Sequence, residues 1–147
     1  MVTTAPRGWI LGRLATLVAM FWMGSLWTIC VVVATGLFSF LDDRHLAGMI
    51  AGQFFHVATW LGVVFAGVLA VLLGAVGLLT RRLGVWIALA VVPPLANEVG
   101  LLPIMEAARQ AGNMAFFGSL HVGSIALFAI AGIATVVLVL RLTRPAT

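Results

Sequence analysis

The most regular feature of this chain is a series of four long apolar stretches separated by short polar links. The stretches cover residues 14–38, 48–80, 84–105 and 114–140. About 20 residues in a helix cross the ~30 Å hydrocarbon core of a bilayer, so each stretch is long enough to span it. The second stretch exceeds one membrane thickness and is expected to be tilted or to project from the membrane.

Short links place successive helices side by side and antiparallel. The pattern therefore predicts one all-α membrane domain over residues 1–147, folded as an integral membrane up-down four-helix bundle. The composition agrees, because 63% of the residues are hydrophobic and only 8% are charged. Pro93, Pro94 and Pro103 remove backbone donors from the third stretch, which predicts kinks on either side of Asn97 and Glu98.

The charged residues indicate how the chain is oriented. The N-terminal segment, the link between the second and third stretches and the C-terminal segment carry six arginines and no acidic residue. The other two links hold two arginines and three acidic residues. The positive-inside rule then predicts a multi-pass protein of the bacterial inner membrane with both termini in the cytoplasm. Because the arginines mark span ends and form no basic stripe, no nucleic-acid partner is expected.

Three ionisable residues, His56, Glu98 and His121, lie inside the apolar stretches. Such residues cost ~2.5–3.5 kcal/mol at the centre of a spanning helix and usually serve a function. At 1.5 Å per residue, all three lie about 11–12 Å below the same outer boundary. The sequence therefore predicts one polar site in the outer, periplasmic half of the bundle. Further polar and sulfur-containing residues are expected to support this site or to form its approach: Gln53, Asn97 and Ser124, and Met49, Met105 and Met114.

Several chemistries fit that set. Two imidazoles at matched depth are able to ligate haem b, and a His–Met–Glu set is able to bind a copper-like transition metal. A proton relay or a transported substrate is a further alternative. These residues do not identify the ligand. The sequence contains no nucleotide-binding, metalloprotease or hydrolase motif, which predicts that the protein is not an enzyme. A non-catalytic accessory subunit of a larger membrane complex and a small transporter or channel built as a homo-oligomer remain open.

Other deep residues are assigned to packing. Cys30, the single cysteine, is expected to act as a small buried hydrophobe. Trp22, Trp27 and Trp60 lie too far from the span ends to be interfacial anchors, so they are expected to pack in the bundle or line its cavity.

Several ordered motifs carry a family resemblance. The segments 21–27 (FWMGSLW), 36–38 (GLF) and 51–56 (AGQFFH), followed by 97–105 and 116–121 (FFGSLH), resemble the transmembrane protein 205-like family. That family is similar in outline to copper-resistance membrane proteins and has no established biochemical activity. The resemblance implies a four-helix membrane protein associated with tolerance of metal-containing drugs. It extends to Trp22, Gly24, Gly36, Phe38, Gly52, Asn97, Pro103 and His121, whereas Val122 stands where the family often has a glycine.

Overall fold

The computed structural model describes residues 6–144, and within this range every regular element is a helix. Four helical spans are long and apolar enough to cross a membrane: Gly8–Phe40, Arg44–Ala75, Arg81–Gln110 and Met114–Leu142. The predicted all-α fold of the membrane type is therefore confirmed. The chain is a multi-pass membrane protein.

Two of the spans contain a short π-helical segment. The elements along the chain are α1 (Pro6–Trp27), the π-helical η1 (Thr28–Val33), α2 (Ala34–Phe40), α3 (Arg44–Ala75), α4 (Arg81–Ala96), the π-helical η2 (Asn97–Leu101), α5 (Leu102–Gln110) and α6 (Met114–Leu142). Helix α4 continues through Pro93 and Pro94, and the amide of Asn97 donates to the carbonyls of both prolines. The irregularity expected near Asn97 is thus the widened turn of η2.

The helix ends differ from the expected ones. The second helix ends at Ala75 and not near residue 80, because Gly77, at a φ of 69°, turns the chain out of the helix. The third helix continues past residue 105 to Gln110, and Gly112, at a φ of 71°, follows it. The apolar pattern indicates where the chain leaves hydrocarbon, whereas glycine in the left-handed region decides where these helices stop.

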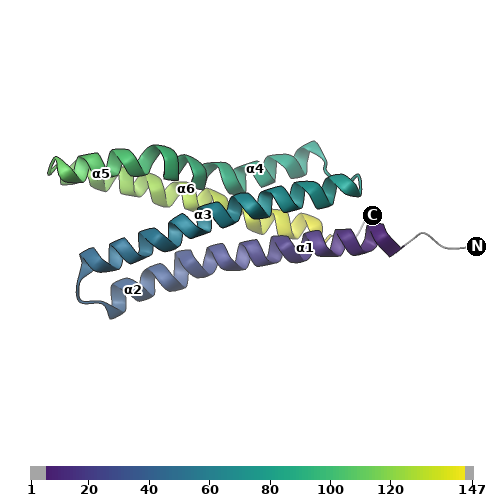
Figure 1. Cartoon of the computed structure of the whole chain (residues 1–147), viewed down its shortest axis with the longest axis horizontal. Coiled ribbons are helices and arrows are strands. Elements are labelled where there is room, and N and C mark those ends of the chain that lie inside the picture. The colour runs from purple at the N-terminus through teal and green to yellow at the C-terminus, as the bar shows by residue number, and fades with distance from the viewer. Residues whose placement is uncertain (1–5, 145–147) are drawn as a thin grey trace, which may run out of the picture.

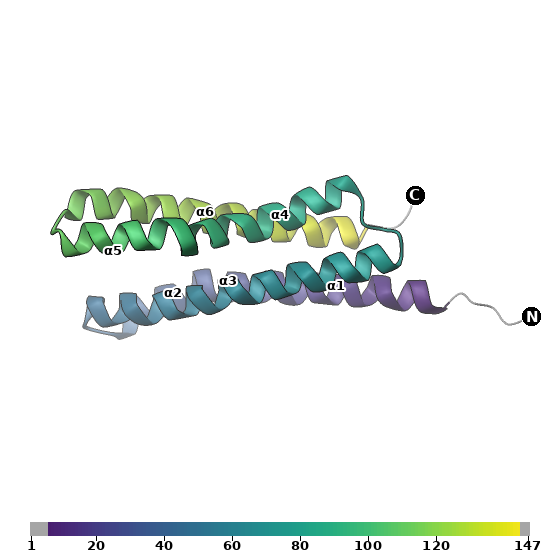
Figure 2. The same cartoon turned by 45° about the horizontal axis from the view of Figure 1, so that its top comes forward.

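The helices form two antiparallel hairpins, α1–α2 with α3 and α4–α5 with α6 (Figures 1 and 2). The largest core cluster joins the hairpins near the α3–α4 link. It consists of Ala15, Ala19, Trp22, Leu69, Leu73, Ile87, Ala90, Ala134, Leu138 and Val139. A smaller cluster of Leu26, Ala58, Phe128 and Ala131 follows toward the middle of the bundle. Close packing therefore holds the hairpins together at one end and in the centre.

Two tryptophans of α1 fix its position by packing on glycines of the neighbouring helices. The indole of Trp22 covers Gly62 of α3 so closely that a Cβ there would lie 3.2 Å from Trp22 Nε1. Trp27 covers Gly132 of α6, and Trp27 Nε1 donates a hydrogen bond of 3.3 Å to the Gly132 carbonyl. Small residues at helix interfaces permit this approach in a membrane.

The expectation that all the deep tryptophans face inward is wrong for Trp60. Its side chain is exposed on α3, whereas Thr59 and Gly62 of the same helix are buried. Consecutive residues of a helix are about 100° apart, so depth alone does not place a side chain on the inner face.

Candidate functional site

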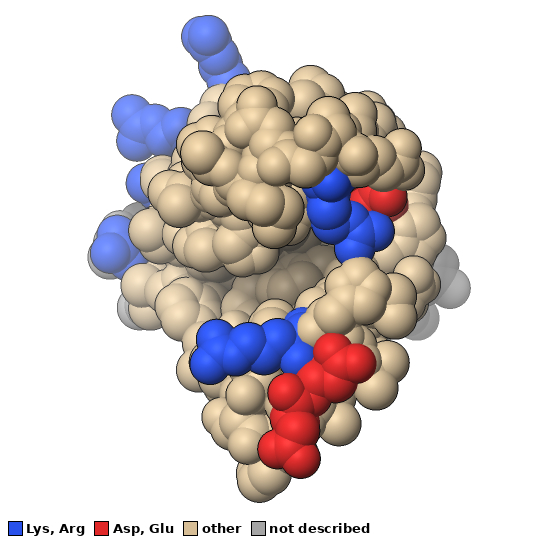
Figure 3. Space-filling view, turned by 90° about the vertical axis from the view of Figure 1, so that its left-hand side faces the viewer, with Lys and Arg blue, Asp and Glu red and all other residues tan. Residues whose placement is uncertain are grey.

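A cavity of about 1050 Å³ lies between the two hairpins, toward the end formed by the α2–α3 and α5–α6 links. Residues of both hairpins line it. Figure 3, which views that end of the molecule, shows the hollow with arginine side chains on opposite sides. Ligand cavities in proteins commonly enclose ~300–1,000 Å³, so this volume is sufficient for a sizeable small molecule.

The wall of the cavity is mainly apolar, and its charged residues belong to the helix ends. The apolar lining residues include Leu26, Trp27, Phe38, Phe55, Phe117, Ile125 and Phe128. The charged and ionisable lining residues of the link end are Arg44, His45, Glu106 and Arg109. We call these four residues the mouth. A mostly apolar wall with a few polar groups is typical of small-molecule sites.

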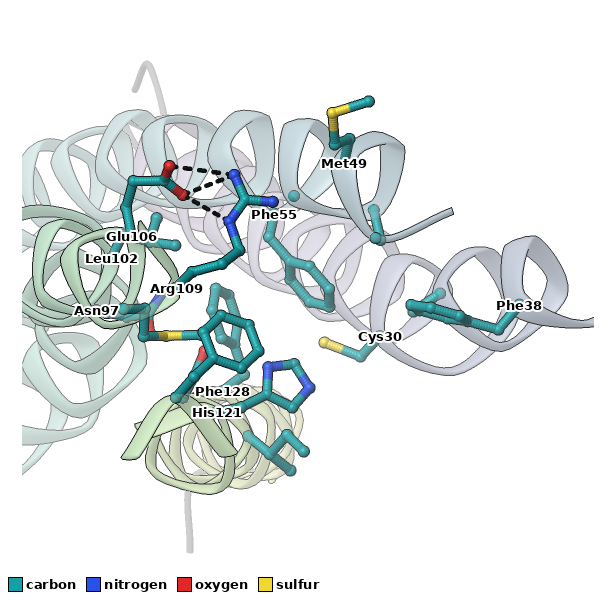
Figure 4. A pocket seen from close by; sticks show the side chains of 18 of the residues that line it. Cys30, Phe38, Met49, Phe55, Asn97, Leu102, Glu106, Arg109, His121 and Phe128 are labelled. Carbon is teal, nitrogen blue, oxygen red and sulfur yellow. Dashed lines mark hydrogen bonds and ion pairs between the residues drawn. The ribbon is translucent and has the colours of Figure 1, made fainter. Parts of the chain in front are cut away.

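A polar network crosses the mouth from one hairpin to the other. Arg109 of α5 donates from Nε and Nη2 to the two carboxylate oxygens of Glu106, each at 3.1 Å (Figure 4). Its Nη1 also donates to Nδ1 of His45 on α3, at 3.4 Å. Arg44, at the start of α3, has no ion pair within residues 6–144. Arg109 is thus already paired with a carboxylate, whereas the guanidinium group of Arg44 is available to bind an anion.

Asn97 is the buried polar residue of the cavity wall. It is the first residue of η2 and only 3% exposed, and its Oδ1 has no hydrogen-bond partner among the described residues. A buried carbonyl oxygen without a partner costs about 1–3 kcal/mol. π-helical turns are also frequent at functional sites. Asn97 thus belongs to the cavity wall, but its Oδ1 is enclosed by the protein and is an uncompensated cost to the fold.

His121 of α6 and Cys30 of η1 both line the cavity. The His121 ring stacks on Phe117 of the same helix, with ring centres 6.2 Å apart and planes at 9°. In Figure 4 the imidazole of His121 and the thiol of Cys30 point into the same part of the cavity. Cys30 belongs to η1 and is only partly buried, so it is part of the cavity wall and not simply core filling.

His56 and Glu98 form a separate pair outside the cavity wall. His56 Nδ1 of α3 and Glu98 Oε1 of η2 lie 2.5 Å apart and share a hydrogen bond. The side chain of His56 is 49% exposed and that of Glu98 is 14% exposed. Neither residue lines the cavity. The structure thus joins two of the three expected ionisable residues and places His121 elsewhere.

The sequence profile of a family described as a domain of unknown function (DUF4149) matches residues 17–114. The chain belongs to the DUF4149 family. No curated protein and no solved structure matches it. The family match supports an uncharacterised membrane family and does not confirm the resemblance to the transmembrane protein 205-like family.

The remaining predicted residues of this DUF4149 protein also divide between the cavity and the outer surface. Met49, Met105, Met114 and Ser124 line the cavity, whereas Gln53 is exposed and does not. Within residues 6–144 there is no group of three or more His, Cys, Asp or Glu side chains placed to hold a metal ion. The sulfur atoms and His121 are the soft donors that the cavity offers.

The mouth arginines were not among the site residues predicted from the sequence. Arg44 and Arg109 were counted only as charges in the two links that also carry acidic residues. A signal was present, because these two are the arginines that depart from the otherwise one-sided placement of positive charge.

Proposed function

We propose that this DUF4149 protein is a non-catalytic inner-membrane binding protein whose ligand occupies the cavity between the hairpins. The observation that carries the proposal is a cavity of about 1050 Å³ between the hairpins whose wall is mainly apolar. The apolar wall favours a ligand that is mostly hydrocarbon.

The orientation of the molecule follows from its charges. We place both termini in the cytoplasm, because Arg81, Arg82 and Arg141 lie at the end of the bundle opposite the mouth. Two cation–π contacts support an interface there: Arg13 lies 3.8 Å from the ring centre of Trp9, and Arg141 lies 5.6 Å from that of Trp86. In this orientation the mouth opens toward the periplasmic side of the membrane.

Filling the cavity is expected to abolish ligand binding. Gly52 lines the cavity and a Cβ there meets no atom within 4 Å, so Gly52→Phe adds a large side chain at a position of the wall with open space around its Cβ. The probe is ricinoleyl alcohol, a neutral long chain with a hydroxyl part-way along it. Native mass spectrometry of the wild type is expected to show one bound probe per chain, and Gly52→Phe at least a ten-fold loss of that adduct.

Gly67→Phe is the matched control. Gly67 lies on the same helix, has equally open space around its Cβ position and does not line the cavity. This variant should bind the probe like the wild type. Equal binding in the wild type and Gly52→Phe would overturn the proposal.

Asn97→Leu tests the cost of the enclosed amide oxygen. Removing a buried carbonyl without a partner is expected to stabilise the ligand-free protein by about 1 kcal/mol. Equilibrium unfolding measures this gain, and a loss of stability in Asn97→Leu would contradict the cost assigned to the unpartnered oxygen.

A soft metal ion is the second candidate ligand, as the sequence and the resemblance to the transmembrane protein 205-like family suggest. The observation in its favour is that Cys30, His121 and Met105 line one cavity, since thiolate, imidazole and thioether ligands suit Cu(I). Haem b at the same place would have His121 as its imidazole ligand, because His56 is bonded to Glu98 outside the wall.

Titration with Cu(I) against a chromophoric chelator tests this candidate. Wild-type protein is expected to withdraw one Cu(I) per chain, and His121→Ala to weaken that binding at least ten-fold. His56→Ala is the comparison, because the proposal predicts no change there. An absorption spectrum of the purified protein, oxidised and reduced, reports haem directly. Equal Cu(I) binding by wild type and His121→Ala would overturn His121 as a metal ligand, no Cu(I) withdrawn by the wild type would overturn the metal site, and a spectrum without a haem band would overturn haem.

A further inference from the structure

The mouth of the cavity carries charge that a purely apolar ligand would not use. Four ionisable residues surround it, Arg44 and His45 from the start of α3 and Glu106 and Arg109 from α5. Two guanidinium groups face one carboxylate, so the lining carries a net positive charge with His45 neutral. The two hairpins each contribute one of the arginines (Figure 3).

The acidic groups near the mouth are already engaged or lie outside the wall. Glu106 accepts from Arg109 and also from Gln110, whose Nε2 lies 2.9 Å from Glu106 Oε1. Asp43 accepts from the amides of His45 and Leu46 as the N-cap of α3. Asp42 does not line the cavity. Arg44 is thus the charged group of the mouth left to a ligand, and Glu106 holds Arg109 in place on the other side of the hollow.

The cavity is deep enough for one acyl chain. Asn97 of the inner wall lies twelve residues before Arg109 on the same continuous span, which corresponds to about 18 Å along a helix. One leaflet of a bilayer, half of ~30 Å, is filled by a chain about 15 Å long. A chain with its head at the mouth therefore reaches the level of Asn97 and lies along the aromatic wall.

We propose that the ligand is a single-chain amphiphile whose anionic headgroup, a carboxylate or a phosphate, is bound at the mouth by Arg44 with Arg109, and whose chain extends toward Asn97. This inference rests on the cavity being the ligand site. Arginine forms the strongest hydrogen bonds to such headgroups, because its planar fork matches two anionic oxygens at once. The apolar wall then excludes free acetate or inorganic phosphate, which lack a chain to bury.

Protection of Cys30 from alkylation measures occupancy of the cavity. Cys30 is the single cysteine of the chain and lines the cavity wall, so the rate of its reaction with N-ethylmaleimide reports whether that space is filled. The protein is held in nanodiscs of zwitterionic lipid. The probes are ricinoleate, ricinoleyl phosphate and ricinoleyl alcohol, which share one chain and differ only in the headgroup, with acetate and inorganic phosphate as chainless controls.

Both anionic probes are expected to protect Cys30 at concentrations on the order of ten-fold below that of ricinoleyl alcohol. Arg44→Gln should remove most of this difference and leave the affinity for the alcohol unchanged. Arg81→Gln, at the opposite end of the bundle, is the matched control and should behave like the wild type. A carboxylate site and a phosphate site are distinguished by which of the two anionic probes binds more tightly.

The possible failures are distinct. Equal protection by the alcohol and by both anionic probes would overturn the headgroup assignment and leave the cavity as the ligand site. Protection by acetate or inorganic phosphate alone would overturn the assignment to an amphiphile. No protection by any probe, with Cys30 still reactive, would overturn the cavity proposal itself.

Discussion

Trp22→Ala is expected to lower the free energy of unfolding by about 3–5 kcal/mol, the range for removing a large aromatic side chain from a packed core. Trp22 is 2% exposed and belongs to the cluster that joins the two hairpins. Its indole fills the space above Gly62 and also packs against Phe65, with ring centres 6.2 Å apart. In a membrane, helix association depends on such close packing more than on the exclusion of water.

The measurement is equilibrium unfolding in a fixed lipid–detergent mixture, with Trp9→Ala as the control. Trp9 lies on the same helix but is exposed, so its replacement is expected to change the unfolding free energy far less. Because the Trp22 cluster closes the bundle opposite the cavity, the same variant should also let the hairpins separate and lose the ricinoleyl alcohol adduct. Comparable stabilities for the two tryptophan variants would contradict the importance given to the Trp22–Gly62 contact.

The four spans were predictable because a bilayer imposes one simple requirement on the chain. A helix that crosses hydrocarbon needs a minimum apolar length, and that length is visible in one sequence without any knowledge of packing. The ends of helices were less predictable. Residues 106–110 are polar enough to leave the hydrocarbon, yet they continue as helix until Gly112 adopts a left-handed φ.

The sequence indicated the depth of each ionisable residue of the candidate site but not the direction in which its side chain points. His56, Glu98 and His121 were expected at one level, and the structure brings His56 and Glu98 into contact across α3 and η2. His121, from the neighbouring helix, faces the cavity instead. The rise per residue fixes depth in advance, whereas the rotation of each helix about its axis depends on which side chains pack.

The cavity itself has no signature in a single sequence. It arises because the hairpins are joined by clusters near the α3–α4 link and in the middle, while the residues facing each other beyond that point leave space. Glycines at positions 48 and 52 belong to that wall. In the sequence they indicate only a surface suited to close helix packing, and the structure leaves open space around the Cβ position of Gly52.

His56→Ala is expected to destabilise the protein by about 2–3 kcal/mol, because it removes the hydrogen-bond partner of the Glu98 carboxylate. Glu98 is 14% exposed within the third span, and His56 is its hydrogen-bond partner in the structure. A carboxylate that loses its partner inside a membrane must take up a proton or stay charged in a medium of low dielectric constant. The expected loss of unfolding free energy is smaller than the ~3–5 kcal/mol of a fully buried pair, because 49% of the His56 side chain is exposed.

The double variant His56→Ala/Glu98→Gln separates this cause from lost packing. If the unpaired carboxylate is responsible, adding Glu98→Gln to His56→Ala recovers at least 1 kcal/mol, since a neutral amide tolerates the site better than a charge. The four proteins of the cycle are compared by equilibrium unfolding at one pH. Strictly additive losses would mean that His56 contributes only its contacts, such as that with Trp60, whose ring centre is 6.4 Å away. Because neither residue lines the cavity, all four proteins should still bind ricinoleyl alcohol. That result would mean that the His56–Glu98 pair stabilises the bundle and that ligand binding depends on the cavity.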